Sequence, residues 1–290
     1  MNDYLVRATA ADDRIRAFAA TTRDLTEEAR ARHNSSPIIT AALGRLMTAA
    51  LIMGTMLKSE GEKLTLKLEG DGPAHNIIAI ADNTGGVKGY AGDHSVLLPP
   101  NAKGKLDVAG AVGKGVLRVT RSDARGEPFT GTCELVSGEI AEDLTYYFAT
   151  SEQTPSGVGL GVLMNKDNTV RCAGGFIVQV MPGITDEELE MLEQRLGSIA
   201  SVTSMLNDGM TPEDMLRYIL PDPTFHEKRE LRYHCGCSRE SVEGVLLSLG
   251  RKELTSLADR PVEVHCDFCE SDYVFTQEEV LELLGRTNNA

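Results

Sequence analysis

The chain has 290 residues, 41% of them apolar, and a formal net charge of −14 at pH 7, proportions that exclude a wholly disordered or collagen-like chain. The acidic surplus argues against nucleic-acid partners, because phosphate neutralisation needs a basic face. The N-terminus has no basic segment followed by an apolar stretch, and no unbroken apolar run is long enough to cross a bilayer, so we expect a cytosolic protein without a membrane partner.

The negative charge is concentrated in the C-terminal third of the chain. Residues 1–182 carry 19 basic and 21 acidic residues, residues 183–231 carry 4 and 11, and residues 232–290 carry 6 and 11. This distribution predicts a boundary near residue 182. We expect a core domain over 1–182, a linker over 183–231 and a small domain over 232–290.

Short strands separated by glycine turns dominate the first part of the chain. Apolar alternation predicts strands over 4–8, 14–20, 63–69, 75–81, 115–121, 129–136 and 169–180. Helices are predicted over 23–33, 37–57 and 139–150, the second of them apolar on nearly every side and therefore buried. Three glycines between residues 157 and 161 interrupt a further run. This pattern indicates an α+β domain with an antiparallel sheet and packed helices.

The pattern becomes helical after Pro182. Thr185 and Glu188 form a capping box, and apolar residues then recur at helical spacing in Leu189, Leu192, Leu196 and Ile199. Thr211 and Pro212 begin a second, shorter helix. Residues 184–230 therefore read as a helical linker whose apolar stripe lies against another surface.

The last 59 residues read as a compact α+β module. A helix is predicted over 239–249, two strands lie within 262–275 around a cysteine-bearing turn, and Thr276 begins a terminal helix. About 59 residues is marginal for an unaided hydrophobic core, so a bound metal ion would supply the missing stability.

Four of the six cysteines lie in this module. Cys235 and Cys237 form a CxC pair, and after 28 residues Cys266 and Cys269 form a CxxC pair. Two close pairs of thiols match a tetrahedral zinc site, and a reducing cytosol disfavours permanent disulfides. His234 and His265 adjoin the pairs, and we expect them to be neighbours of the site because four sulfurs complete a tetrahedron.

Three functions are compatible with such a site. A structural zinc ribbon would bind a protein partner, since the local acidity discourages nucleic acid. A thiol–disulfide oxidoreductase would instead place CxxC at the start of a helix, whereas this CxxC lies in a predicted hairpin. A redox switch is the third, because metal-bound thiolates react with oxidants, each close pair could close on itself, and the module would unfold without its metal.

The cysteine pattern at the C-terminal end of an acidic chain of this length resembles the redox-regulated heat-shock chaperone family called the 33 kDa chaperonin. The resemblance spans the whole chain and implies an ATP-independent holdase, not an enzyme. It implies one zinc ion held by Cys235, Cys237, Cys266 and Cys269 in the reduced form. Under oxidative and heat stress it implies Cys235–Cys237 and Cys266–Cys269 disulfides, zinc loss, linker unfolding, homodimerisation and binding of unfolded client proteins.

The resemblance suggests roles for the linker stripe. The stripe of Leu189 and its helical neighbours covers apolar surface that oxidation exposes, is itself that surface, or simply packs on a core, and the sequence leaves these alternatives open. The remaining chemistry-bearing residues indicate no further site. Cys133 and Cys172 lie in strand patterns as small buried residues, His33, His75 and His94 have no catalytic partners, and no phosphate-binding GxxxxGK[ST] motif occurs.

Overall fold

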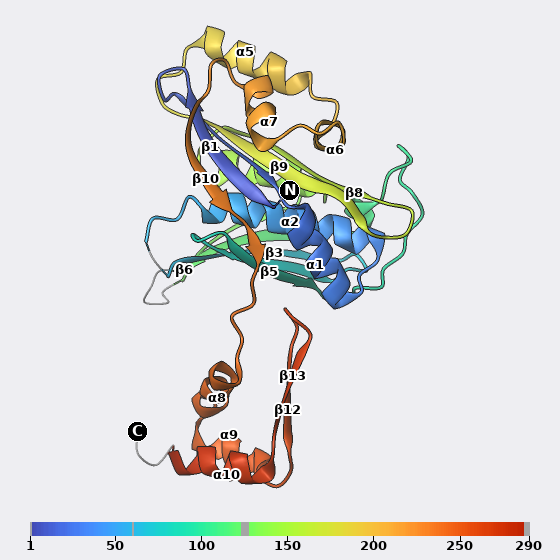
Figure 1. Cartoon of the computed structure of the whole chain (residues 1–290), viewed down its shortest axis with the longest axis vertical. Coiled ribbons are helices and arrows are strands. Elements are labelled where there is room, and N and C mark those ends of the chain that lie inside the picture. The colour runs from blue at the N-terminus through green and yellow to red at the C-terminus, as the bar shows by residue number, and fades with distance from the viewer. Residues whose placement is uncertain (1, 60, 123–127, 287–290) are drawn as a thin grey trace. The chain divides into compact units, whose positions relative to one another are not determined.

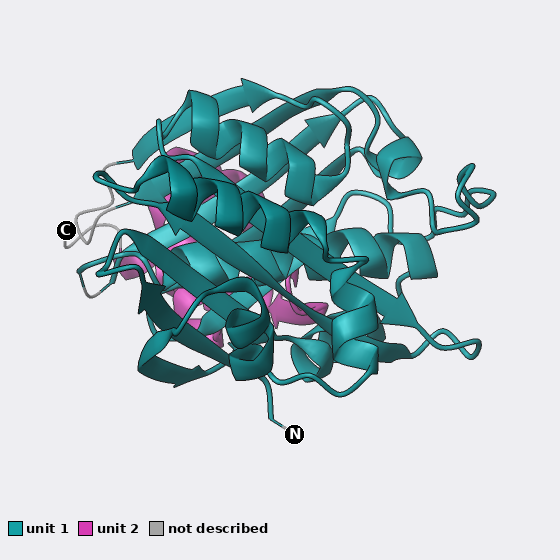
Figure 2. Ribbon diagram, turned by 90° about the horizontal axis from the view of Figure 1, so that it is seen from above, with its two compact units in different colours: residues 1–234 teal, residues 235–290 magenta. Residues whose placement is uncertain are grey.

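The computed structural model describes residues 2–59, 61–122 and 128–286, and these form mixed α and β structure (Figure 1). The chain divides into two compact units, Met1–His234 and Cys235–Ala290 (Figure 2).

The first unit contains a five-stranded sheet, sheet A, in which all neighbouring strands are antiparallel. Its strands, in spatial order, are β10 (Thr224–Glu230), β1 (Tyr4–Ala10), β2 (Ile15–Thr21), β9 (Val170–Val180) and β8 (Ser156–Met164). The strands predicted over 4–8 and 14–20 are confirmed as β1 and β2, which pair directly with each other across the turn at Asp12 and Asp13.

A six-stranded sheet, sheet B, forms the second layer of this unit. Its order is β11 (Arg232–Tyr233), β5 (Gly86–Ala91), β4 (Asn76–Asp82), β3 (Lys63–Gly70), β6 (Gly115–Ser122) and β7 (Pro128–Glu134). The two-residue β11 runs parallel to β5, and all other pairs are antiparallel. The predicted α+β class with antiparallel sheets is therefore confirmed.

Helix α2 (Pro37–Gly54) lies between the two sheets (Figure 1). The Ser36 side chain caps its first turn by accepting the N–H of Ile39, and Pro37 occupies the first helical position. Among the described residues it is the one helix long and apolar enough to cross a membrane, but most of it is buried within this unit. Its apolar side chains join those of both sheets in one core, as a helix that is apolar on every side requires.

Three shorter helices complete the layers around α2. They are α1 (Arg23–His33), α3 (Val108–Val112) and α4 (Ile140–Thr150). The bounds of α1 match the sequence prediction, α4 begins one residue later than expected, and α3 was not predicted.

Helices α5 (Asp186–Gly197), α6 (Val202–Asn207) and α7 (Pro212–Ile219) cover the outer face of sheet A (Figure 1). The capping box predicted at Thr185 is present, and a second one occurs at Thr211. Leu192 of the predicted stripe is buried, and Leu196 and Ile199 pack against the same cluster. The residues that these helices cover are small or apolar: Val6, Ala8, Ala10, Ile15, Ala17, Ala19, Phe176 and Val178.

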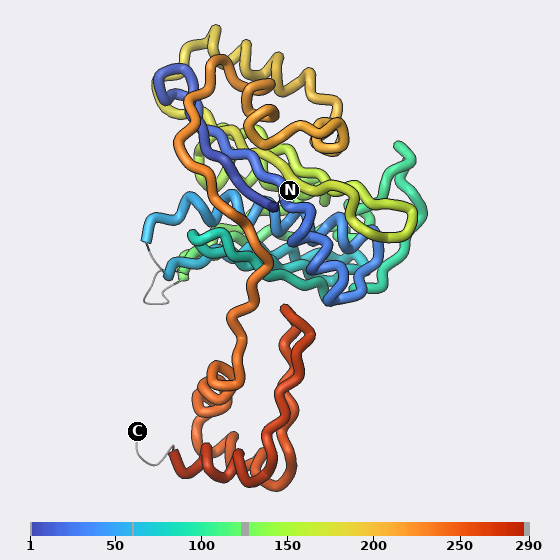
Figure 3. Tube along the Cα trace, viewed as in Figure 1, coloured from blue at the N-terminus to red at the C-terminus, as the bar shows by residue number. Residues whose placement is uncertain are grey.

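The segment Thr224–His234, here called the strap, joins the edges of the two sheets (Figure 3). Its first part, β10, pairs with β1, and its last part, β11, pairs with β5. Backbone hydrogen bonds from Leu231 to Asp3 (3.0 Å) and from His234 to Val87 (2.7 Å) continue this attachment. The expectation of helix throughout 184–230 is therefore wrong for 224–230, where alternating half-buried and exposed side chains fit a sheet edge.

The second unit consists of three helices and a hairpin: α8 (Arg239–Ser248), α9 (Gly250–Leu257), β12 (Val262–Cys266), β13 (Ser271–Phe275) and α10 (Gln277–Arg286). The predicted pair of strands is confirmed. Its core contains six buried residues, Val242, Leu246, Leu254, Phe275, Val280 and Leu283. So small a core contributes little stability without a further cross-link.

Candidate metal centre

The four cysteines of the second unit come from two short segments that converge. Cys235 and Cys237 precede α8, whose N-terminus is capped by the Ser238 side chain. Cys266 ends β12, and Cys269 lies in the turn that leads to β13. The Cys266 carbonyl accepts the N–H groups of Cys269 (3.1 Å) and Glu270 (2.9 Å). This turn therefore brings the two thiols of the CxxC pair to one side of the hairpin.

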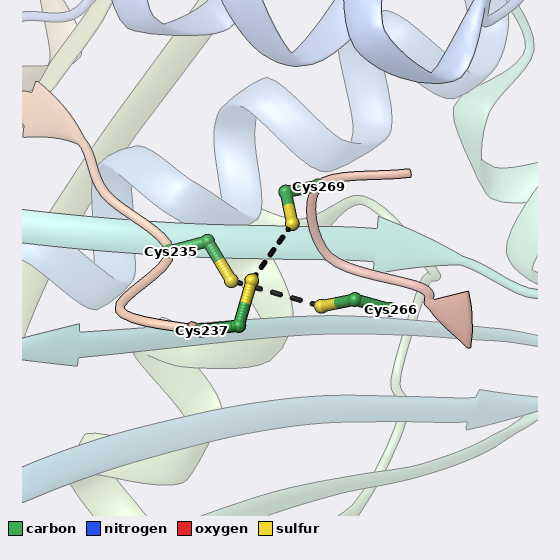
Figure 4. A group of neighbouring side chains, drawn as sticks. All are labelled: Cys235, Cys237, Cys266 and Cys269. Carbon is green, nitrogen blue, oxygen red and sulfur yellow. Dashed lines mark hydrogen bonds between the residues drawn. The ribbon is translucent and has the colours of Figure 1, made fainter. Parts of the chain in front are cut away.

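The structure gathers the sulfurs of all four cysteines into one cluster (Figure 4). Every Sγ atom lies within 4.8 Å of the others. Two close contacts join the two segments, at 3.1 Å between the Sγ atoms of Cys237 and Cys269 and 3.7 Å between those of Cys235 and Cys266. Four thiolates about 2.3 Å from a central ion lie roughly 3.8 Å apart in a tetrahedron. The cluster has this size and donor set, and it could hold a metal ion.

Polar neighbours act on the thiols of this cluster. The Tyr273 hydroxyl donates a hydrogen bond to Cys237 Sγ (3.2 Å), and Ser271 Oγ lies 3.3 Å from Cys269 Sγ. Burial raises the pKa of Cys269, but hydrogen bonds with Ser271, Cys237 and Cys266 outweigh it and bring the value down to about 7. Burial raises the pKa of Cys266. At least one sulfur of the cluster therefore deprotonates readily near neutral pH, as a metal-binding thiol must.

The neighbouring histidines lie outside the sulfur cluster of the described residues. His265 Nδ1 is 2.7 Å from Asp272 and Nε2 is 3.3 Å from Glu270, so both ring nitrogens face carboxylates. The hydrogen bond with Asp272, partly opposed by desolvation, raises the His265 pKa. His234 is the last residue of the first unit, where its backbone binds Val87.

Cys133 and Cys172 belong to the first unit and take no part in this cluster. Cys133 is buried in β7, where desolvation raises the pKa of its thiol to about 11. Cys172 is half-buried in β9, and desolvation raises its pKa as well. Both thiols are therefore poor nucleophiles, in agreement with the small-residue role predicted for them.

Sequence reasoning did not identify Tyr273 as a neighbour of the site. Tyr273 pairs with Val264 across the β12–β13 hairpin, so both lie beside the cysteine-bearing turn. The alternation of residues in β13 could have indicated this position, because it places Tyr273 on the same face of the strand as Ser271 and Phe275.

The fold and the cluster define a two-unit α+β protein whose small C-terminal unit gathers four thiols into a possible metal site. The family model described as Hsp33 protein matches residues 3–276. The chain belongs to the Hsp33 family, and its relatives are named as chaperonins.

Relatives of known name share the full length of this chain. The 33 kDa chaperonin of Lachnoclostridium phytofermentans is 51% identical over 292 residues, covering 99% of this chain and 100% of the relative. The 33 kDa chaperonin of Bacillus subtilis is 45% identical over 289 residues, covering 98% and 99%. The crystal structure of the 33 kDa chaperonin of Thermotoga maritima superposes with a TM-score of 0.90 at 38% identity and covers 100% of both chains.

Proposed function

We propose that this protein is a redox-regulated, ATP-independent holdase that acts in the cytosol and protects unfolding proteins from aggregation under oxidative and heat stress. In the reduced form Cys235, Cys237, Cys266 and Cys269 would hold one zinc ion. Oxidation would convert these ligands into disulfides, unfold the second unit and the linker, and produce a homodimer that binds client proteins.

One observation carries this proposal. A separable layer, α5 to α7, covers the apolar face of sheet A, and the chain leads from that layer through the strap directly to Cys235. Only His234 separates the end of β11 from the first cysteine. A structural change that begins at Cys235 therefore reaches, by chain connection alone, the segment that covers apolar surface.

The small core of the second unit makes it dependent on its cross-link. A bound zinc ion would hold the four sulfurs as thiolates and join the segment before α8 to the β12–β13 turn. Structural zinc is worth on the order of 10–16 kcal/mol of apparent binding free energy, which exceeds what a core of this size supplies. Loss of the thiolate donors would therefore unfold the unit.

Oxidation of the cluster forms two disulfides. Two thiols lose two protons and two electrons to form each disulfide, and an oxidant such as hydrogen peroxide takes them up and is reduced to water. Family resemblance implies pairing as Cys235–Cys237 and Cys266–Cys269. All four sulfurs lie within 4.8 Å of one another, so the cluster brings together the sulfurs of that pairing and also those of a pairing between the two segments. Peptide mapping of the oxidised protein distinguishes the pairing within each segment from the pairing between segments.

The opened form would expose apolar surface and still stay in solution. The linker carries 11 acidic and 4 basic residues, and this charge opposes self-association of an unfolded segment. Met205 and Met215, now buried against sheet A, are flexible side chains that suit adaptable contacts with varied clients.

One set of measurements tests the proposal. Zinc content, free thiols and suppression of aggregation of a chemically unfolded client are followed before and after peroxide treatment. We expect loss of one zinc ion, loss of four thiols, and suppression only afterwards.

Two other outcomes would support a different function. Retention of metal with no suppression of aggregation would favour a structural ribbon for a protein partner. Catalytic turnover of a disulfide substrate at low stoichiometry would favour a thiol–disulfide oxidoreductase.

A further inference from the structure

Strand β7 forms one edge of sheet B and is exposed along most of its length. It pairs with β6 on one side over seven residues, Pro128–Glu134, without a bulge. No strand of the described residues pairs with its other side. A strand in this position presents unpaired backbone N–H and C=O groups.

The hydrogen-bond pattern identifies which residues of β7 face outward. The Leu135 N–H binds the Gly115 carbonyl (2.9 Å), so Gly115 and Leu135 form a hydrogen-bonded pair of the ladder. Such pairs alternate along antiparallel strands, and Phe129, Gly131 and Cys133 therefore also point their backbone groups toward β6.

The residues between them direct their backbone groups away from the sheet: Thr130, Thr132 and Glu134. The 2.9 Å contact between the hydroxyls of Thr120 and Thr130 agrees, because side chains of non-hydrogen-bonded pairs lie closer together. No backbone N–H of these three residues has a partner within the described part of the chain. Pro128, at the start of the strand, has no N–H to offer.

The other long edges of the two large sheets are protected and β7 is not. Strand β10 carries charged residues from Glu227 to Glu230 and has a bulge in its pairing with β1. Strand β8 has a register shift in its pairing with β9, between Leu163 and Met164. By contrast β7 has no charged residue from Pro128 to Cys133, no internal proline and no bulge. Charged residues, internal prolines and bulges are the features by which proteins prevent a further strand from pairing with a sheet edge.

A cavity of mixed lining adjoins this edge. Phe129, which is 70% exposed, lines a cavity of about 530 Å³ together with Met53, Leu57 and Phe148, and charged and polar residues make up most of the rest of the lining. Side chains of a strand added beside β7 alternate between the outer face of sheet B and this inner side. The apolar part of the lining would therefore receive apolar side chains from such a strand.

From this geometry we infer that an extended apolar segment of an unfolded client protein pairs with the free edge of β7 as an additional strand. This inference rests on the proposed chaperone function and specifies where one client segment binds. Because the edge is already free while the cysteines are reduced, it would add to the affinity of the surface that oxidation exposes and would not by itself suppress aggregation. Pairing through main-chain hydrogen bonds depends on few side chains, so many different unfolded sequences could bind in this way. A second copy fits less well, because a facing β7 would offer only Phe129 as a large inward side chain beside Gly131 and Cys133.

The test uses the full-length oxidised protein and a synthetic peptide of alternating threonine and valine with lysine at both ends. The Thr132→Pro variant removes one outward N–H and blocks close approach, while the β6–β7 ladder does not use that N–H. Thr132→Val is the matched control, because it keeps the N–H and the β-branched shape. We expect Thr132→Pro to weaken peptide binding about tenfold or more and Thr132→Val to leave it within about twofold.

Two further measurements guard against misfolding of the proline variant. A peptide that is N-methylated at every residue between its terminal lysines should bind the wild-type protein about tenfold more weakly, since neither of its edges keeps donors that can face β7. Hydrogen exchange should show new protection at Thr130, Thr132 and Glu134 on peptide binding, in alternation with residues already protected by β6. A peptide bound to a sheet face would not produce that alternation.

The failure of this inference differs from the failure of the proposed function. If oxidised wild-type protein does not suppress client aggregation, the chaperone proposal is overturned. If it does, but the peptide binds equally well to Thr132→Pro and leaves the three outward amides unprotected, the edge-pairing inference is overturned. Peptide-independent dimerisation that Thr132→Pro abolishes would also overturn it, in favour of a second copy at this edge.

Discussion

Cys266 and Cys269 supply half of the sulfur cluster from one turn, so we expect their joint replacement by serine to abolish tight metal binding. Serine hydroxyls stay protonated at neutral pH and are poor zinc ligands. The double variant should lose zinc to a chelator at concentrations that leave the wild-type protein loaded, and residues 235–290 should become accessible to protease.

A matched double variant, Cys133→Ser with Cys172→Ser, removes the same number of thiols from the first unit. Both of these cysteines lie outside the cluster. This control should keep wild-type zinc affinity, although loss of the buried Cys133 thiol could reduce thermal stability. Equal metal affinity in the Cys266/Cys269 variant and the wild type would refute the ligand assignment.

Asp3 gives the first unit a pH-dependent stability. Its buried carboxylate accepts the N–H of Leu25 (2.7 Å) at the start of α1, and burial outweighs this bond and raises its pKa from 3.8 to about 6. A carboxyl whose pKa is raised on folding stabilises the protein fully below pH 4, and this stabilisation is lost as the pH rises through 6.

We therefore expect the wild-type protein to lose on the order of 3 kcal/mol of stability between pH 4 and pH 8, and the Asp3→Asn variant not to show this loss. Chemical denaturation of both proteins across this range, followed by circular dichroism, measures the difference. Parallel pH profiles for the variant and the wild type would contradict it.

At the scale of single elements, α7 packs closely on sheet A. Met215, Leu216 and Ile219 are fully buried there. Truncating such a side chain to alanine costs about 2–5 kcal/mol. We expect Leu216→Ala to loosen this cover and to give partial suppression of client aggregation without oxidant.

Tyr218→Ala on the same helix is the control, because the Tyr218 side chain is 44% exposed and lies outside the cluster on sheet A. It should behave as the wild type in the reduced state. Activity that depends on oxidant to the same degree in both variants would count against a role of α7 as a cover.

The same elements show what the sequence could predict. The long apolar helix α2 and the alternating strands β3 and β4 were predicted because burial dictates their patterns directly. Strand β8 was missed because glycines replace its apolar side chains. A Cβ at Gly159 would collide with the Phe176 ring, and one at Gly161 would lie 2.7 Å from Thr203.

Other elements were missed for different physical reasons. Strand β10 is highly charged, and only its partner β1 makes it a strand. Helix α9 was missed because the helix predicted over 239–249 stops before a glycine, Gly250, which has a φ of +80° and is the first residue of α9. The four cysteines were predicted to come together because two close pairs of thiols form a metal-binding pattern that is visible in the sequence. The contact of Tyr273 with Cys237 and the hydrogen bond from Leu25 to Asp3 depend on tertiary structure and were not predicted.

At the scale of the whole molecule, the two units should differ in their dependence on metal. The first has an extensive core built on α2 and two sheets, and the second has six buried apolar residues. We expect a strong chelator under reducing conditions to unfold residues 235–290 while sheets A and B remain folded. Residue-resolved hydrogen exchange before chelation, after it, and after zinc is restored checks this, and uniform loss of protection in both units would contradict it.

The strap has a mechanical consequence. Its hydrogen bonds lie in series, from His234 at one end through β11 and Leu231 to β10. Hydrogen bonds in such an arrangement break one at a time from a free end, so those to the two sheet edges need not break simultaneously. A disturbance entering at Cys235 would detach the strap from Val87 first and reach Thr224 last, so partial oxidation would release it by degrees.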